Sequence, residues 1–511
     1  MENKYNEKTP VVKGERIFSA TLTAAILAVI LVVNILVYVL NANLGIFYAV
    51  PEEKDLTTIS GATDDLFEEA VRKGAKIEIS FCMSKDDIQL HDTGKFVHKT
   101  ATEYQKRYPK LIELNYINLI TKQDKDGKNV ADELNSYLEA GKELRTHSVI
   151  FRCEDNYRVL TDVYTGTGFV DFFTLDSSGS AIAYDGEEVM AGAMAWVLTD
   201  EKDRRNAYLT VGHYEQIDPA FAKLIELAGY DSKTVDLSAE AVPDDCDLLI
   251  ISTPRNDFET SREGSTIPYA LTECGRLEAY LERGGSLYVS LDPYVKALPE
   301  LEGILEECGI ALSESEVEGS TVRDIVRDFG SSVSPDGYSI ITRHAKGDIS
   351  EAIADKVNKY SDDDVILNYA GALALSGTAK PLLLSSGSSV CEDGGVTTRT
   401  GGDFAVAAYN RLSYGEGTKE ATVFVNSSLY LTVSSALVTN GYANKDFVYA
   451  VFEELFGAKN LPYGCNTVLY DTQTLENLTM GTATLYTVIA LAVPVALLAV
   501  GVVVIIKRRN R

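Results

Sequence analysis

The segment LEAYLERGGSLYVSLDP (Leu277–Pro293) contains the end of a helix, a stop signal and a strand in immediate succession. The helical pattern covers Thr272–Glu282, and the apolar run SLYVSLD covers Ser286–Asp292. Between them lie Gly284 and Gly285. Glycine adopts the left-handed conformation that ends a helix, so the pair lets the next strand begin at once. This unit predicts a parallel sheet covered by helices.

The same alternation extends toward the N-terminus. AYLTVG (Ala207–Gly212), Lys233–Leu237 and DLLIIST (Asp247–Thr253) are typical of buried strands, and Pro219–Ala228 of a helix. Almost uninterrupted apolar strands that alternate with short helices indicate a sheet with both faces covered. We therefore expect an α/β fold with a doubly wound parallel sheet, of the flavodoxin or amidotransferase type, over residues 205–456.

The pattern becomes weaker after Gly309. The polar stretch Ser385–Asp403 is expected to be a surface loop. Two apolar segments, Asp364–Ala374 and Pro381–Ser385, are expected to return strands to the sheet. A further strand, a closing helix and a linker are expected over Ala421–Leu431, Asp446–Phe456 and 457–484.

Residues 41–204 predict a smaller α/β lobe with a thioredoxin-like pattern but without the redox cysteine pair of that fold. Its expected helices are Asp64–Lys73, Lys99–Tyr108 and Glu187–Leu198, and its expected strands are Lys76–Cys82, Leu111–Ile117, Ser148–Cys153 and Arg158–Val163. The last helix is predicted to be amphipathic, with Val189, Ala193, Trp196 and Val197 on the stripe that faces the core.

Two long apolar segments flank these lobes, at residues 17–40 and 485–506. Each is roughly 33–36 Å long as a helix, enough to cross a hydrocarbon core of about 30 Å. Basic residues precede the first segment, within residues 1–16, and fill the tail 507–511. Because Lys and Arg near span ends stay on the cytoplasmic side, both termini are expected in the cytoplasm and the central region outside the plasma membrane. The short basic tails and the two-span plan favour a bacterial origin.

The charge of the chain narrows its possible partners. The net charge is −28, and the basic ends make the central region more negative still. This excludes a nucleic acid or an anionic lipid surface as the ligand of the central region, since phosphates require a positive face. The seven cysteines and five histidines are scattered without metal-ligand spacing, so neither a metal nor a cofactor is expected, and most of the cysteines are expected in the core.

Seven residues at predicted strand ends form the candidate ligand crevice. In α/β sheets, ligands bind at the carboxyl ends of the strands. The candidate residues are Gly212, His213, Glu215, Thr253, Pro254, Asp292 and Pro293. The other interpretation is that Glu215 and Asp292 cap helices or bind loop amides.

Catalysis has little support in the sequence. A nucleophile would need a tight strand-to-helix turn such as Gly-x-Cys-x-Gly, and none is present. Cys246 precedes a strand and Cys274 lies inside a helix, so both are expected in the core. A hydrolase pair formed by Glu215 and Asp292 is the remaining catalytic alternative.

Several segments in series resemble the GldG-like auxiliary components of ABC transport systems, a family first named for gliding motility. The stretch Asp185–Glu215 is similar to a family pattern in which a helix headed by Gly-Glu, a spacer and a strand lead to Gly-His-Gly-Glu. Here the third position of that last motif is Tyr214. Val242–Pro254 and Leu277–Pro293 are similar to two further family segments, and the C-terminal apolar segment with its arginine stop also matches.

The resemblance implies a non-catalytic subunit anchored beside a separately encoded ABC permease and ABC ATPase. The chain has no G-x-x-x-x-G-K-[ST] phosphate loop of its own. Two alternatives remain open: a cell-surface receptor that binds a sugar or another small polar ligand, and an exported hydrolase that uses carboxylates.

Overall fold

A computed structural model describes residues 56–469, apart from 122, 124–126, 128, 131–132, 135–143, 162–168, 177, 262–266, 416 and 440. Both predicted membrane segments, 17–40 and 485–506, and the two cytoplasmic ends lie outside the described residues. Among the residues that are described, no helix is long and apolar enough to cross a membrane.

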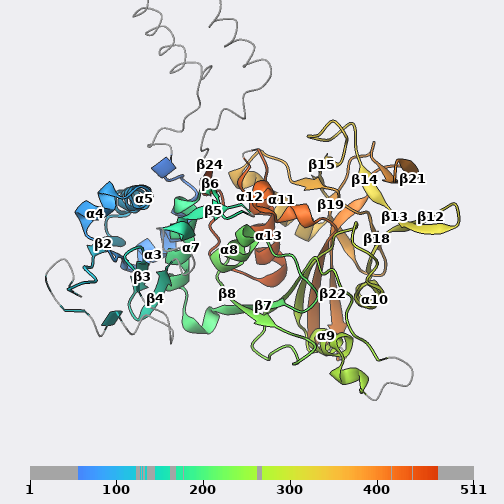
Figure 1. Cartoon of the computed structure of the whole chain (residues 1–511), viewed down its shortest axis with the longest axis horizontal. Helices are drawn as coiled ribbons and strands as arrows, with labels where there is room; N and C mark the ends of the chain where they lie inside the picture. The colour runs from blue at the N-terminus through green and yellow to red at the C-terminus, as the bar shows by residue number, and fades with distance from the viewer. Residues whose placement is uncertain are drawn as a thin grey trace, which may run out of the picture. The chain divides into compact units, whose positions relative to one another are not determined.

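The N-terminal lobe, coloured blue to green in Figure 1, contains a four-stranded sheet with the strand order β2-β1-β3-β4. Its strands are β1 (Ile77–Phe81), β2 (Ile112–Tyr116), β3 (Val149–Cys153) and β4 (Asn156–Leu160). β1 runs parallel to β2 and antiparallel to β3. The α-helices given by the described residues of this lobe are α3 (Thr63–Lys73), α4 (Lys85–Leu90), α5 (Gly94–Arg107) and α7 (Gly186–Leu198).

The prediction that α7 is amphipathic is wrong. The helix is buried all round from Gly186 to Ala195, whereas Trp196 is partly exposed. The cause is that α7 contacts β3 and β4 on one side and α5 and α8 (Pro219–Leu227) on others. A helix covered on several sides needs apolar residues around its whole circumference.

The second lobe contains a ten-stranded sheet whose five strands at one end, including the edge strand, are parallel. The strands β7 (Arg205–Thr210), β8 (Tyr230–Val235), β9 (Leu248–Ser252), β10 (Ser286–Ser290) and β23 (Lys419–Asn426) lie in the order β8-β7-β9-β10-β23. All four pairings are parallel. In sequence order this is 2-1-3-4-5, the order of flavodoxin-like sheets.

Beyond β23 the sheet becomes antiparallel, so it is mixed rather than wholly parallel as predicted. β22 (Ala405–Tyr414) pairs with β23 along one edge and with β19 (Lys380–Leu384) along the other, and β16 (Arg343–His344) pairs with β19. β18 (Leu373–Leu375) joins the start of β22 and pairs with β11 (Ile310–Leu312). The α/β class is confirmed.

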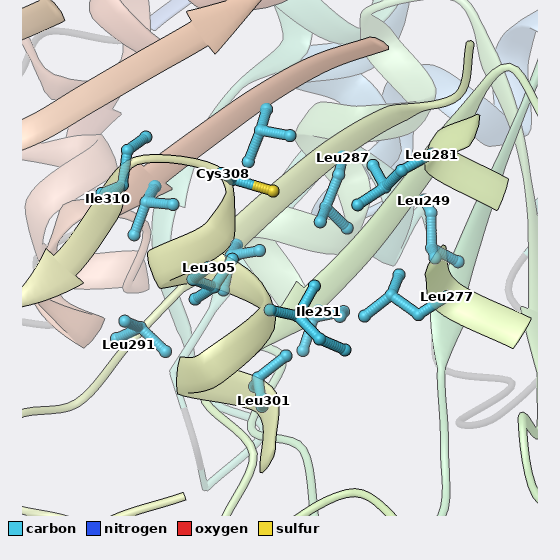
Figure 2. Packing of buried hydrophobic residues seen from close by; sticks show 14 of the residues in the cluster. Leu249, Ile251, Leu277, Leu281, Leu287, Leu291, Leu301, Leu305, Cys308 and Ile310 are labelled. Atoms are coloured by element: carbon cyan, nitrogen blue, oxygen red, sulfur yellow. The ribbon is translucent and has the colours of Figure 1, made fainter. Parts of the chain in front are cut away.

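Helices cover both faces of the parallel strands. On one face the sheet is covered by α9 (Glu273–Glu282) and α10 (Pro299–Glu307). Leu277 and Leu281 of α9 and Leu301 and Leu305 of α10 pack in one cluster with strand residues. These strand residues are Leu249, Ile251 and Leu287, as Figure 2 shows. On the other face, the Tyr288 ring lies 5.4 Å from Phe221 of α8 and 6.0 Å from Phe452 of α13 (Asn444–Phe456).

The glycine pair works as predicted. Gly284 has a φ of +93°, in the left-handed region. Gly285 is required for a second reason, since a Cβ there would lie 2.4 Å from the ring of Tyr280.

The segment after residue 311 is more ordered than the sequence indicates. Instead of a surface loop, Ser385–Asp403 contains the hairpin of β20 (Val390–Asp393) and β21 (Val396–Thr400). Its turn is Gly394-Gly395, both with positive φ, as a tight hairpin requires. Both strands are rich in polar residues, which hid their pattern. The predicted strand Asp364–Ala374 is divided between β17 (Ile366–Asn368) and β18, and only β18 joins the main sheet.

The remaining elements of the described residues are one 13-residue helix, α11, and several short helices and strands. They are η1 (Val170–Phe172), β5 (Phe173–Leu175), β6 (Ala181–Tyr184), η2 (Glu201–Asp203), η3 (Tyr269–Leu271), β12 (Glu314–Val317), β13 (Ser320–Arg323), β14 (Ile325–Arg327), β15 (Ser339–Ile341), α11 (Asp348–Tyr360), η4 (Leu429–Leu431), α12 (Ser434–Val438) and β24 (Val468–Leu469). β24 lies in the segment expected as a linker, and it pairs with β6 of the N-terminal lobe.

Candidate functional site

The seven candidate residues all follow the carboxyl ends of neighbouring parallel strands. Gly212, His213 and Glu215 follow β7, Thr253 and Pro254 follow β9, and Asp292 and Pro293 follow β10. β7 and β9 are the pair at which the strand order reverses, the usual ligand position in such sheets. The loops are joined by backbone hydrogen bonds, from Arg255 to His213 (2.8 Å) and from Thr253 to Ser290 (2.8 Å).

His213 is held between two carboxylates. Its Nδ1 lies 3.1 Å from Oε1 of Glu215, and its Nε2 lies 3.0 Å from Oε2 of Glu273 at the start of α9. The side chains of the three residues are 5–7% exposed. The ring also stacks on Phe258, with centroids 4.0 Å apart and planes 4° apart. Glu273 is a partner that the sequence pattern did not identify.

The charge state of His213 follows from this geometry. Burial by itself would lower the pKa of His213, but the hydrogen bonds to Glu215 and Glu273 outweigh burial and raise the pKa to about 9. Correspondingly, His213 holds the pKa of each glutamate below its usual value despite burial. At neutral pH His213 is therefore an imidazolium that donates from both nitrogens, and neither nitrogen is free to accept a proton.

Two residues of this edge have strained backbones. Thr253 has a φ of +45° and is 1% exposed, and Tyr214 has a φ of +56° and is 72% exposed. A β-branched residue with positive φ is a genuine outlier. The conformation of Tyr214 is one that glycine adopts without cost.

The other candidate residues bind the backbone or pack. Asp292 Oδ1 accepts a hydrogen bond from the Tyr294 amide (3.0 Å), and Pro293 packs against Gly371. Glu215 also accepts from the His213 amide (2.8 Å). These contacts agree with the interpretation that the two carboxylates bind loop amides. They give no support to a hydrolase pair of Glu215 and Asp292.

The cysteines show no sign of activation. All seven are free, and all but Cys246 are buried. Burial raises the pKa of Cys246 to about 11 and that of Cys274 to about 12, so both remain thiols at neutral pH. Within the described residues no group of three or more His, Cys, Asp or Glu side chains is placed to hold a metal ion.

A buried ion cluster joins the two lobes at the first turn of α7. Lys445 Nζ of α13 lies 3.0 Å from Glu188 Oε2, and the Tyr449 hydroxyl donates to Glu188 Oε1 (2.7 Å). Lys223 Nζ of α8 lies 3.0 Å from Asp185 Oδ2. The remaining oxygen, Asp185 Oδ1, has no hydrogen-bond partner among the described residues. A hollow of about 20 Å³ beside the cluster has room for one water molecule.

Glu187, the neighbouring residue, binds both ends of the folded region. One oxygen, Oε1, accepts hydrogen bonds from the amide (2.6 Å) and the hydroxyl (2.7 Å) of Ser60. The other, Oε2, accepts from the amide of Asn466 (2.8 Å). The Asn466 side chain donates in turn to the Thr58 carbonyl (3.3 Å). Sequence reasoning placed these glutamates on a helix but gave them no role, since their partners lie far away in the chain.

Comparisons with known proteins give limited information. No family model matches the chain, and no curated protein matches its sequence. Among solved structures, the chain is similar to the mmIFT52 N-terminal domain, with 13% identity and a TM-score of 0.34 over 48% of this chain and 96% of that one. A putative ThuA-like protein from Bacteroides uniformis has 12% identity and a TM-score of 0.27, over 50% of this chain and 94% of that one. A glutamine amidotransferase from Thermotoga maritima has 11% identity and a TM-score of 0.26, over 49% of this chain and 84% of that one. At these scores the similarities assign no function.

Proposed function

We propose that this protein is a non-catalytic auxiliary subunit of a bacterial ABC transporter complex, anchored in the plasma membrane by residues 17–40 and 485–506. Both termini are then cytoplasmic. The central region is exported, with an N-terminal α/β lobe and a doubly wound, flavodoxin- or amidotransferase-like domain. Its partners are a separately encoded permease, a separately encoded ATPase and the lipid bilayer.

The observation that carries this proposal is the meeting of the two ends of the folded region. Ser60 and Asn466 bind the two oxygens of one carboxylate, and Val468 pairs with Tyr184 in the β24–β6 ladder. The chain therefore enters and leaves the fold at one place. The segments 17–40 and 485–506 therefore precede and follow neighbouring positions of the fold, which supports a shared two-span anchor.

The chemistry of the candidate site supports a role without catalysis. His213 already donates from both nitrogens, and the buried thiols are protonated. Lys445 is buried, and its positive charge is balanced by the carboxylate of Glu188. A general base, a nucleophile or an electrophile needs a free reactive atom, and each of these groups is occupied within the fold.

The test is purification of the tagged chain from its own membranes in mild detergent, followed by mass spectrometry. We expect a polytopic permease and an ATPase with a phosphate loop in amounts comparable to the chain. A matched control replaces residues 485–506 by an unrelated apolar helix of equal length, which keeps the anchor but removes specific packing. Recovery of the chain alone, stable and monodisperse, would contradict the proposal and favour a receptor.

A further inference from the structure

Four tyrosines meet at the carboxyl edge of the main sheet, beside β10 and β23. Tyr369, which follows β17, is the centre of this group. Its ring centroid lies 5.2 Å from Tyr338, 5.7 Å from Tyr294 and 5.8 Å from Tyr430. Tyr294 follows β10, and Tyr430 lies in η4 after β23. Four separate segments thus contribute to one group, which we call the tyrosine platform (Tyr294, Tyr338, Tyr369 and Tyr430).

The platform is exposed although its rings are large. Tyr294 is 59% exposed, Tyr369 38% and Tyr430 37%. None of these three hydroxyl groups forms a hydrogen bond with another described residue, so they are available to a ligand. Neighbouring exposed aromatic rings mark interaction sites, because Tyr combines a large apolar face with a polar tip.

The backbone holds the platform in place. Tyr369 has a φ of +51°, and its amide donates to the Tyr338 carbonyl (3.0 Å). The hydroxyl of Ser428 donates to the Asn368 carbonyl (2.6 Å), which ties η4 to the same loop. A strained residue held by its surroundings is a common feature of binding sites. Rigid rings also lose little conformational entropy when they bind.

The arrangement of the rings excludes a small enclosed ligand. The planes of Tyr294 and Tyr369 are 84° apart and those of Tyr338 and Tyr369 are 27° apart, at contact distances. The rings therefore fill the space between them and leave no cage into which a small cation would fit. Small-molecule sites are concave, whereas a packed aromatic patch is typical of the centre of a protein interface.

The charges around the platform select the partner. Three carboxylates contact the platform. Asp292 accepts a hydrogen bond from the Tyr294 amide (3.0 Å), and Asp336 accepts one from the Tyr338 amide (3.2 Å). Glu392 accepts a hydrogen bond from the Tyr338 hydroxyl. Arg327 is in direct contact with this group: its guanidinium lies 2.9 Å from Glu392, and its Nε donates to the Asp336 carbonyl (2.6 Å). Three carboxylates therefore surround one guanidinium, which leaves the group negative in sum. The platform is thus negative at its rim as well as on its ring faces, and both features attract cations.

The protein itself contains an example of the expected contact. The Arg327 guanidinium lies 4.8 Å from the ring centroid of Tyr338 and 4.3 Å from that of Phe329. An arginine therefore already packs on one ring of the platform from within the chain. The exposed rings of Tyr294, Tyr369 and Tyr430 offer the same surface to an arginine from outside.

We propose that the tyrosine platform is a docking surface for a partner protein segment in which arginine or lysine alternates with apolar residues. The apolar side chains cover the rings, and the cations reach the ring faces and the carboxylates around them. This inference goes beyond the transporter assignment and does not depend on it, because a receptor would expose the same surface.

The test uses the full chain in nanodiscs of zwitterionic lipid and measures the binding of defined probes by calorimetry. One probe is an acetylated peptide of alternating leucine and arginine, and the other replaces each arginine by the neutral isostere citrulline. A third probe is a neutral oligosaccharide, and empty nanodiscs correct for lipid binding. We expect the arginine peptide to bind at least about fivefold more tightly than the citrulline peptide, and less tightly as salt is raised.

Variants locate the site. Tyr294→Leu and Tyr430→Leu keep an apolar side chain but lose the aromatic ring. Each should lower the affinity for the arginine peptide about fivefold. Tyr214→Leu is the matched control, since Tyr214 is a more exposed tyrosine outside the platform. Unchanged unfolding midpoints show that the variants are folded. Equal binding of the two peptides, an equal loss in Tyr214→Leu, or binding of the oligosaccharide alone would overturn the proposal.

Discussion

Lys445 and Glu188 form a buried ion pair between the second lobe and the N-terminal lobe, with Nζ 3.0 Å from Oε2. Their side chains are 14% and 6% exposed. Lys445 also donates to the hydroxyl of Thr467 (2.8 Å), immediately before β24. One ammonium therefore binds α7, α13 and the returning C-terminal segment together.

Replacement of Lys445 should destabilise the protein strongly. Lys445→Met leaves Glu188 buried without a counter-charge, and breaking a buried pair in this way costs about 3–5 kcal/mol. The free energy of unfolding in urea can be followed by fluorescence of Trp196, the single tryptophan. Lys359→Met is the control, because the pair of Lys359 and Asp65 lies at the surface and should contribute little. Equal losses in the two variants would contradict the role of the buried pair.

Replacement of Glu187 should release both ends of the folded region at once. In Glu187→Ala the amides of Ser60 and Asn466 lose their acceptor, so we expect faster hydrogen exchange at residues 57–62 and 465–469 together. Mass spectrometry of the exchanged peptides measures this. Glu240→Ala removes an exposed glutamate and should change neither region. Faster exchange at only one end would show that Glu187 does not couple the two.

The stability that His213 contributes should depend on pH. The pKa of about 9 in the folded state lies above the unfolded value of about 6.5, so the contribution is complete below pH 6.5 and is lost as the pH rises through 9. The stability difference between the wild type and His213→Gln should therefore shrink by about 3 kcal/mol over this range. Glu215 and Glu273, whose pKa values are lowered, stay ionised throughout it.

His344 provides the control for this titration. Burial lowers the pKa of His344, so it is neutral above pH 6.5 and its contribution should be constant in the same range. Urea unfolding of the wild type and both glutamine variants, at steps between pH 6 and pH 9, separates the two cases. A constant difference for His213→Gln would show that His213 is not held as an imidazolium.

Tyr214 offers a stabilising substitution. Its positive φ costs a residue with a side chain about 1 kcal/mol, so Tyr214→Gly should be more stable than Tyr214→Ala by about this amount. Both variants remove the exposed ring, so the comparison isolates the backbone. Urea unfolding measures the difference, and equal stabilities would show that the loop relaxes around the alanine.

Local patterns predicted the elements that depend on local sequence. The apolar runs at Asp247–Thr253 and Ser286–Asp292 became β9 and β10, and the glycine pair ended α9 as expected. The hairpin within Ser385–Asp403 was missed, because its exposed strands carry few apolar residues. Its Gly394-Gly395 turn was the signal that could have identified it.

The site could be predicted only in part, for a physical reason. The rule that ligands bind at strand ends placed His213 and Glu215 correctly at one edge of the sheet. It did not identify Glu273, which reaches His213 from a helix, or the role of Glu187, whose partners are Ser60 and Asn466. The tyrosine platform was missed for the same reason, since four segments contribute one ring each and no segment has a pattern of its own.

The binding of both ends of the folded region to Glu187 also determines how this region would bear mechanical load. A pull that moves the entry at Ser60 and the exit at Asn466 together displaces the folded region as a rigid body. A pull that separates them acts first on one carboxylate and on the short β24–β6 ladder. The parallel sheet lies outside this force path. The contacts of Glu187 with Ser60 and Asn466 would therefore break before the core unfolds. A relative movement of the two ends would be absorbed at the first turn of α7.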